Sequence, residues 1–431
     1  MGSMPTLSER RWLRLGALCG LYVAQGIPFG FVTIALVAWL ADRGVGTGEI
    51  GAVIAMTSLP WTFKFLWGPM IDRYGFPAMG RRRPWILAAQ TCMALTLGVM
   101  AVAPDLSNNV QLVTWLVCLI NIFASVQDVA VDALAVDLLQ PQERGRANGL
   151  MYGCSYGGAA IGGAVVGGVM AEAGLRAGVV FQVGLILAIM LIPLALRERP
   201  GERILPWSAG CAGERAEAER VHSLAELMKR LAKAFRSRAA WVCAILALAS
   251  KCAVAVSSTV IVTLTIQKLA WEQEAFTQFQ GAVSVWFGLV GSVAGGFLAD
   301  RMGARRLAMI ATTALGGLWI AFGAASGSCS APFFVKAMVC LEGFVYGVFA
   351  VSLFAIFMGV SWRVVAASQF TAYMALMNLS NTGGAWCAGK LSGWMSESWI
   401  YVFIGLAQVA VLGILMFVRN GPLETMGQNE H

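Results

Sequence analysis

The sequence predicts an all-α membrane protein with twelve transmembrane helices in two six-helix halves. Three observations predict this fold class: the apolar composition, the number of long apolar segments and an internal repeat. Of the 431 residues, 58% are hydrophobic and only 13% are charged, whereas a soluble domain carries roughly 25% charged residues. This composition favours a polytopic membrane protein over a chain of soluble domains.

Twelve apolar segments are long enough to cross a bilayer as helices. They lie at 13–40, 49–70, 84–104, 109–139, 146–172, 175–197, 239–267, 275–299, 307–325, 332–360, 367–392 and 397–418. A polar stretch separates the sixth segment from the seventh. The predicted domains are therefore a six-helix bundle over 1–197, a linker over 198–238 and a second six-helix bundle over 239–431.

The placement of basic residues predicts the orientation of the chain. The net charge is +8, from 31 Lys and Arg against 23 Asp and Glu. Most basic residues lie in the N-terminal segment and in alternate loops, whereas the other loops hold only Arg43, Arg176 and Lys268. By the positive-inside rule both termini are cytoplasmic. Because the charge reports topology, a nucleic-acid partner is excluded and the bilayer is the expected partner.

The second part of the linker has the pattern of an amphipathic helix. Its apolar residues share one helical face, and basic residues fill the remainder: Val221, Leu224, Leu227, Met228, Leu231 and Phe235, against Lys229, Arg230, Lys233, Arg236 and Arg238. This pattern predicts a helix lying on the inner membrane surface. A soluble regulatory helix is the alternative.

The sequence carries no pattern of catalytic or metal-binding residues. None of the ten cysteines has CxxC spacing, and the two histidines, His222 and His431, lie outside the apolar segments. Neither a GxxxxGK[ST] phosphate loop nor a GxSxG nucleophile motif occurs. We therefore expect no catalytic residue, no metal and no cofactor, and neither an enzyme nor an ATP-driven pump.

One loop motif occurs in both halves. Gly68, Asp72, Arg73 and Gly75 lie at the end of the second segment, and the same four residue types return with identical spacing at 296, 300, 301 and 303, at the end of the eighth. Basic clusters follow both copies. This pattern resembles the inner-loop signature of the major facilitator superfamily. The resemblance implies two six-helix bundles with pseudo-twofold symmetry that rock around a central cavity, and a transporter expected to act as a monomer.

Three stretches narrow the resemblance to the peptide/acetyl-coenzyme A transporter branch of the superfamily. They are Leu21–Pro28; Phe63–Arg73 with Gly80–Arg83; and Gln127–Asp132 with Glu143–Gly145. The branch implies a proton-coupled importer of the bacterial inner membrane, and AmpG-type members import anhydromuropeptides for peptidoglycan recycling. AmpG proteins carry additional central hydrophobic segments, whereas 198–238 is polar here. An importer of siderophores of the pyochelin or rhizobactin type and a drug-efflux proton antiporter are the alternatives.

Charged residues within the predicted spans are candidates for proton coupling, because a charge in the bilayer needs a partner or a function. Asp128 and Asp132 share a face of span four, roughly 20 and 13 Å from its inner end, and Lys64 lies at a matching depth in span two, about 12 Å inward. The resembled fold implies that spans two and four are neighbours, and in that case we expect Lys64 to pair with one of them. The aspartates either close an inner gate through this pair or carry the proton, in which case Asp128→Asn abolishes gradient-driven uptake and retains binding.

The second half offers a similar pair. Glu342 in span ten is a further candidate for proton coupling, and Lys251 in span seven is its candidate charge partner. An internal Lys251–Glu342 pair without a role in transport is an equal alternative.

Uncharged polar residues are the candidates for the substrate cavity. Span one is predicted to break at Gln25-Gly26-Ile27-Pro28, because proline removes a backbone hydrogen bond and so frees a carbonyl group. The candidate cavity residues are Tyr22, Gln25, Gln127, Gln369, Tyr373 and Asn378. The glycines of span five, in contrast, predict close helix packing rather than binding.

The repeated motif has a separate expected role. Its charged residues lie at inner helix ends and are predicted to control conformational exchange rather than substrate choice. This gating set is Asp72, Arg73, Asp300 and Arg301, with Asp137 placed near Arg144 and Arg146 as a further gate or loop pair.

Overall fold

The computed structural model describes residues 6–104, 109–212, 223–265, 285–325 and 331–418, with 106, 217, 269 and 279 as single positions. Within these ranges the chain is helical and forms no β-strand. It divides into two compact units, and each unit includes a short segment from the other half of the sequence. The first comprises 1–139, 154–232 and 363–371; the second comprises 140–153, 233–362 and 372–431.

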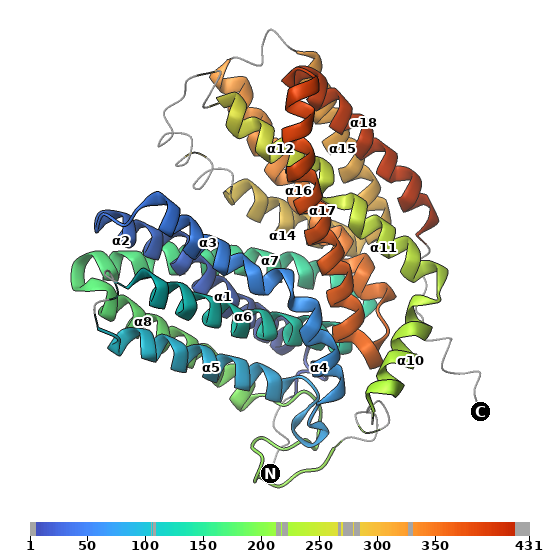
Figure 1. Ribbon diagram of the computed structural model, residues 1–431. Coiled ribbons are helices and arrows are strands. Elements are labelled where there is room, and N and C mark those ends of the chain that lie inside the picture. Colours follow the sequence, from blue (N-terminus) through green and yellow to red (C-terminus); the bar gives the residue numbers. More distant parts are fainter. Residues whose placement is uncertain are drawn as a thin grey trace. The chain divides into compact units, whose positions relative to one another are not determined.

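Most helices of the first unit run side by side (Figure 1). They are α1 (Arg11–Gly30), α2 (Val37–Asp42), α3 (Thr47–Thr62), α4 (Trp67–Arg73), α5 (Arg83–Val102), α6 (Val110–Leu138), the end of α7 (Arg144–Ala160) and α8 (Val166–Ala195). The closest neighbours are α5 with α6, α5 with α8, and α3 with α6. Span two therefore lies against span four, as the predicted Lys64–aspartate pair requires.

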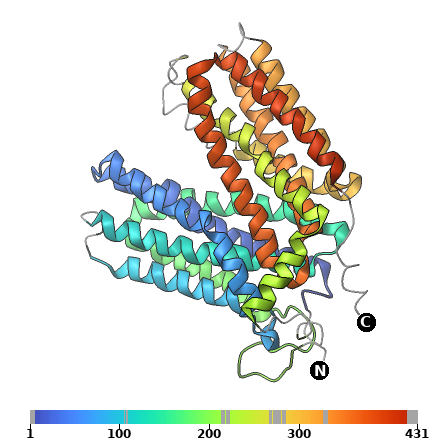
Figure 2. The same cartoon turned by 45° about the vertical axis from the view of Figure 1, so that its right-hand side comes forward.

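The helices of the second unit also run side by side (Figure 2). They are α11 (Arg238–Ser250), α12 (Cys252–Thr263), α14 (Val285–Met302), α15 (Ala304–Ala324), α16 (Pro332–Val360), most of α17 (Ala366–Trp394) and α18 (Glu397–Phe417). The most extensive packing joins α15 to α18 and α14 to α16.

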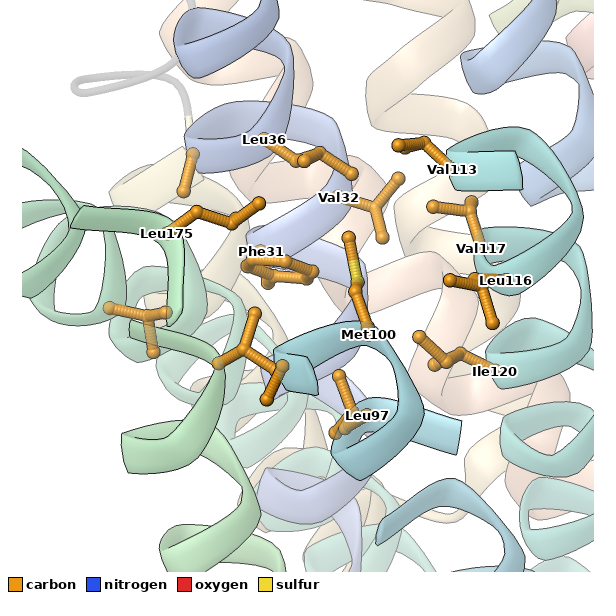
Figure 3. Packing of buried hydrophobic residues seen from close by; sticks show 14 of the residues in the cluster. Phe31, Val32, Leu36, Leu97, Met100, Val113, Leu116, Val117, Ile120 and Leu175 are labelled. Atoms are coloured by element: carbon orange, nitrogen blue, oxygen red, sulfur yellow. The ribbon is translucent and has the colours of Figure 1, made fainter. Parts of the chain in front are cut away.

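A hydrophobic cluster holds the first unit together (Figure 3). Phe31 and Val32 meet Met100 of α5, Val117 of α6 and Leu175 of α8, and most of these side chains are fully buried. Burying a side chain of this size contributes about 1.5–3 kcal/mol relative to leaving it in water. Where these helices are surrounded by lipid, their association is stabilised by van der Waals packing of the same side chains, because lipid tails are as apolar as the side chains themselves.

Glycine allows α1 to approach the end of α7 and the π-helical turn after it (Ile161–Val165) backbone to backbone, which confirms the close packing expected of the span-five glycines. A Cβ atom on Gly158 would lie 2.4 Å from the carbonyl oxygen of Val23, and one on Gly162 would lie 2.0 Å from that of Ile27. Gly26 and Gly30 leave the matching space on α1. Only glycine fits at these four positions.

The break predicted in span one is displaced, and that prediction was wrong in position. Helix α1 continues through Gly26 and Pro28, and a wider π-helical turn follows at Phe31–Leu36. Gly26 packs against α7 rather than opening the helix. Two other spans are interrupted where a lysine lies: Lys64 begins a short 3-10 turn between α3 and α4, and Lys251 separates α11 from α12.

Eight described helical segments are long and apolar enough to cross a membrane. One of them, Pro141–Ala195, covers two predicted spans, which meet at Gly174, a residue with a positive φ of 84°. Span 275–299 is described only from Val285 onwards, as α14. The second part of the linker contains α10 (Leu224–Phe235), which buries Leu227 and Ala234; residues 221 and 222 lie outside the described part. Its place on the membrane surface stays a prediction.

Candidate functional site

A buried ion pair lies at the interruption of span two. The ammonium group of Lys64 donates to Oδ2 of Asp128 over 2.9 Å, and the side chains are 9% and 5% exposed. Gln25 of α1 donates its amide to Oδ1 of the same carboxylate over 2.7 Å. Of the two aspartates expected to pair with Lys64, the structure selects Asp128.

The second aspartate of span four has a different partner. The hydroxyl group of Tyr22 donates to Oδ1 of Asp132, which is 4% exposed. Gln127 donates to the backbone carbonyl of Leu21 over 2.9 Å. Three of the candidate cavity residues, Tyr22, Gln25 and Gln127, therefore link α1 to α6 around the two carboxylates.

The charges of this cluster do not balance. The Lys64 ammonium is close enough to both Asp128 and Asp132 to attract each electrostatically, so the cluster holds one positive and two negative charges when all three groups are ionised. Burying an uncompensated charge costs several kcal/mol. One proton on a carboxylate makes the cluster neutral.

Two tryptophans beside the cluster were missed by the sequence analysis. Trp61 donates its indole N–H to Asn121 of α6 over 3.0 Å, and Trp67 donates to Ser125, also over 3.0 Å. These bonds attach α3 and α4 to one face of α6 on either side of the Lys64 turn. Asn121 and Ser125 precede Asp128 at helical spacing, which was the available signal.

In the second unit, Glu342 of α16 accepts a hydrogen bond from the hydroxyl group of Ser257 over 2.8 Å. Ser257 had not been singled out. The backbone N–H of Lys251 donates to Ser380 of α17 over 3.1 Å, which attaches the interruption of span seven to span eleven. The Lys251–Glu342 pair stays a prediction.

Two of the three candidate residues of span eleven are fully buried. Gln369 lies in the first unit and is fully buried. Tyr373 lies in the second unit, where its ring is packed 5.1 Å from Phe357 and 5.9 Å from Phe235. Asn378 lies five residues farther along α17 and is partly exposed. Of the three, Asn378 is the most accessible.

The first copy of the loop motif forms a dense polar cluster. Asp72 accepts from the backbone N–H and the hydroxyl group of Ser368, over 2.8 and 2.7 Å, and from the N–H of Ala367 over 3.3 Å. Arg82 bridges Asp72 at 2.8 Å and Asp137 at 3.0 Å, with all three side chains buried. Asp137 therefore pairs with Arg82, and the expected grouping of Asp137 with Arg144 and Arg146 stays a prediction.

The second copy is more open. Asp300 lies 3.5 Å from Arg146, and a Cβ atom on Gly145 would touch its carboxylate. Arg144 lies beside Gly359 of α16. Arg301 of the second copy is exposed. Its equivalent in the first copy, Arg73, has its guanidinium group 5.1 Å from the ring of Tyr74. The two copies of the motif therefore make different contacts despite their identical spacing.

Two glutamates of the linker were not predicted as functional. Glu198 accepts from three consecutive backbone N–H groups at the start of α5: those of Arg81, Arg82 and Arg83. Burial and the neighbouring Glu198 carboxylate raise the pKa of Glu202 to about 8. The start of the linker is thus fixed to the first unit by a buried carboxylate at a helix N-terminus.

No group of three or more His, Cys, Asp or Glu side chains that could hold a metal ion occurs among the described residues.

Comparison with known proteins gives one family. Residues 18–280 match the model of the Major Facilitator Superfamily. The chain is 24% identical to the anhydromuropeptide permease of Escherichia coli K12, over 97% of this chain and 82% of the permease. It is 32% identical to an uncharacterised protein of Haemophilus influenzae, over a third (33%) of each chain.

Solved structures show the same fold. The proton:xylose symporter XylE superposes with a TM-score of 0.70 at 13% identity, covering 95% of this chain and 96% of the symporter. The Escherichia coli fucose:proton symporter FucP gives 0.70 at 11% identity, covering 95% and 99%. The fold implies twelve crossings, and these relatives are transporters rather than enzymes. The chain therefore belongs to the Major Facilitator Superfamily.

Proposed function

We propose that this protein is a proton-coupled secondary transporter that imports anhydromuropeptide-type cargo across the bacterial inner membrane by alternating access. The similarity to the anhydromuropeptide permease over nearly the whole chain supports the cargo class. The basic residues of alternate loops support cytoplasmic termini. The chain shares its fold with two proton symporters, and this supports a fold that is compatible with proton coupling.

The observation that carries proton coupling is one ammonium group facing two buried carboxylates. Asp128 already accepts two hydrogen bonds, from the ammonium group of Lys64 and from the amide of Gln25. Asp132 accepts a hydrogen bond from the uncharged hydroxyl group of Tyr22 instead. The proton that neutralises the cluster therefore belongs on Asp132, with Asp128 as the fixed counter-ion of Lys64. Its uptake on one side and release on the other couple the gradient to transport.

The contacts of the loop motifs are proposed to stabilise one state of the transport cycle. Asp72 attaches α4 to the start of α17, and Asp300 meets the segment that begins α7. Each contact joins stretches from different halves of the sequence. Breaking them would change the rate of conformational exchange and leave cargo selectivity intact.

Transport in proteoliposomes tests the coupling. We expect Asp132→Asn to lose accumulation of labelled anhydromuropeptide driven by an imposed pH gradient and to retain counterflow, which needs no net proton movement. Asp42→Asn removes an exposed carboxylate of the same unit and should behave like the wild type. Gradient-driven accumulation by Asp132→Asn at the wild-type rate would refute the assignment.

The cargo is tested separately by thermal stabilisation of the purified protein. We expect anhydromuropeptides to raise the melting temperature more than ferric siderophores or coenzyme A esters do. Stabilisation by a siderophore alone would leave the coupling site standing and replace the cargo. Accumulation that requires an outward proton gradient would instead identify an antiporter.

A further inference from the structure

A groove lies on the second unit where α11 begins and α18 ends. Its volume is about 250 Å³. The lining residues are Arg238, Val242, Ile245, Gly413, Ile414 and Phe417. All but the arginine are apolar, and Phe417 is 59% exposed. The proton-coupling cluster uses none of these residues.

The charge at the mouth of the groove is positive, and no acidic side chain of the described residues pairs with it. Arg238 is exposed and makes no ion pair with any described residue; its guanidinium group stands 5.6 Å from the ring of Phe417. Arg236, two residues earlier, is also exposed. Ser237 between them caps α11 by accepting the N–H of Ala240 over 3.1 Å, which holds the turn in place.

The end of α18 is also adapted to a negative group. A helix C-terminus presents carbonyl oxygens that repel anions. Here the guanidinium group of Arg305 donates to the carbonyl oxygens of Leu415 and Met416, over 3.0 and 2.7 Å. The carbonyl groups nearest the groove are therefore covered by a second cation.

We propose that this groove binds one anionic glycerophospholipid of the leaflet beside the basic loops, with its phosphate at Arg238 and an acyl chain along Val242, Ile245 and Gly413. The first residue of a spanning helix lies at headgroup depth, and a basic residue there contributes about 1 kcal/mol toward an anionic lipid. The apolar walls below it accept a hydrocarbon chain and no soluble anion. The bound lipid would join the start of α11 to the end of α18.

Gly413 offers a direct test, because a Cβ atom there has no neighbour within 4 Å and a larger side chain would enter the groove. The same is true of the exposed Gly317 on α15, outside the groove. The test is native mass spectrometry of purified protein given equal amounts of phosphatidylglycerol and phosphatidylcholine. Arg238→Gln and Gly413→Leu are the test variants, and Lys390→Gln and Gly317→Leu are their matched controls.

We expect the wild type to retain phosphatidylglycerol preferentially, and Arg238→Gln to reduce this retention about fivefold, the equivalent of about 1 kcal/mol. Gly413→Leu should reduce retention of both lipids, and both controls should match the wild type. Equal retention of the two lipids by the wild type, or unchanged retention by Gly413→Leu, overturns the proposal. Displacement of the lipid by millimolar inorganic phosphate would also overturn it. If Arg238→Gln fails to fold, Gly413→Leu decides alone.

Discussion

Substitutions at Lys64 and Asp128 should lower the free energy of unfolding to an extent that depends on the net charge left in the cluster of Lys64, Asp128 and Asp132. With all groups ionised, the wild-type cluster carries one excess negative charge. Lys64→Met raises the excess to two, Asp128→Asn makes the cluster neutral, and the double variant restores an excess of one. If Lys64 interacts with both carboxylates, the double variant should be more stable than Lys64→Met alone.

The magnitude follows from the geometry. At 2.9 Å and an effective dielectric constant of about 20, the attraction between Lys64 and Asp128 is about 6 kcal/mol, most of which desolvation offsets. Removing one partner of a buried pair typically costs about 3–5 kcal/mol. We expect Lys64→Met to cost that much in the free energy of unfolding. Asp128→Asn should cost less, because Asp132 remains beside Lys64.

The assay is a double-mutant cycle on purified protein, with unfolding followed by tryptophan fluorescence against denaturant. Asp42→Asn serves as the exposed control and should leave the unfolding free energy unchanged within about 0.5 kcal/mol. A double variant as unstable as the sum of its single variants would show that Lys64 and Asp128 do not interact. That result would remove the physical basis for a proton on Asp132.

Three further predictions concern other parts of the chain. Asp72→Asn should speed hydrogen exchange of the Ser368 amide about 10–100-fold, because a hydrogen bond to a charged acceptor contributes about 1.5–3 kcal/mol; an unchanged rate would contradict the proposed gate. Burial raises the pKa of Glu202 to about 8, above its unfolded value, so its ionisation destabilises the fold as pH rises from about 4.5 to 8. Glu202→Gln should therefore raise the melting temperature at pH 8 and leave it unchanged near pH 4.5, and equal shifts at both pH values would refute this. Gly158→Ala should destabilise the protein by about 1–3 kcal/mol, whereas Gly157→Ala, which has no neighbour within 4 Å, should melt like the wild type.

Much of the fold was predictable because a bilayer imposes a simple rule on sequence. Each span must be apolar over its whole length, so composition alone located helices such as α5, α15 and α16 within a few residues. The expected depths of Lys64 and the two aspartates were equally accessible, because depth along a helix is a count of residues. The amphipathic pattern of α10 was visible for the same reason.

Which charged side chains form ion pairs could not be predicted from composition or from position along a helix. Asp128 and Asp132 lie one turn apart on the same face, so either could meet Lys64. The choice depends on the 3-10 turn at Lys64 and on Gln25, which occupies the other oxygen of Asp128. The pairing of Asp137 with Arg82 was missed for a related reason. Arg82 comes from a loop whose path depends on Glu198, more than one hundred residues away in the chain.

The sequence by itself determined which segments are apolar enough to cross a membrane and which charged residues lie within them, and it predicts which side holds the basic loops. These properties depend on composition and on position along a helix. Only the tertiary structure decided that Asp128 binds Lys64, that Asp132 binds Tyr22 and that Asp72 binds Ser368. The physical reason is that the sequence of a helix that is apolar on nearly every side does not indicate which face meets its neighbours. The rotation of such a helix about its axis is set by packing contacts, such as those between the glycines of α1 and of span five.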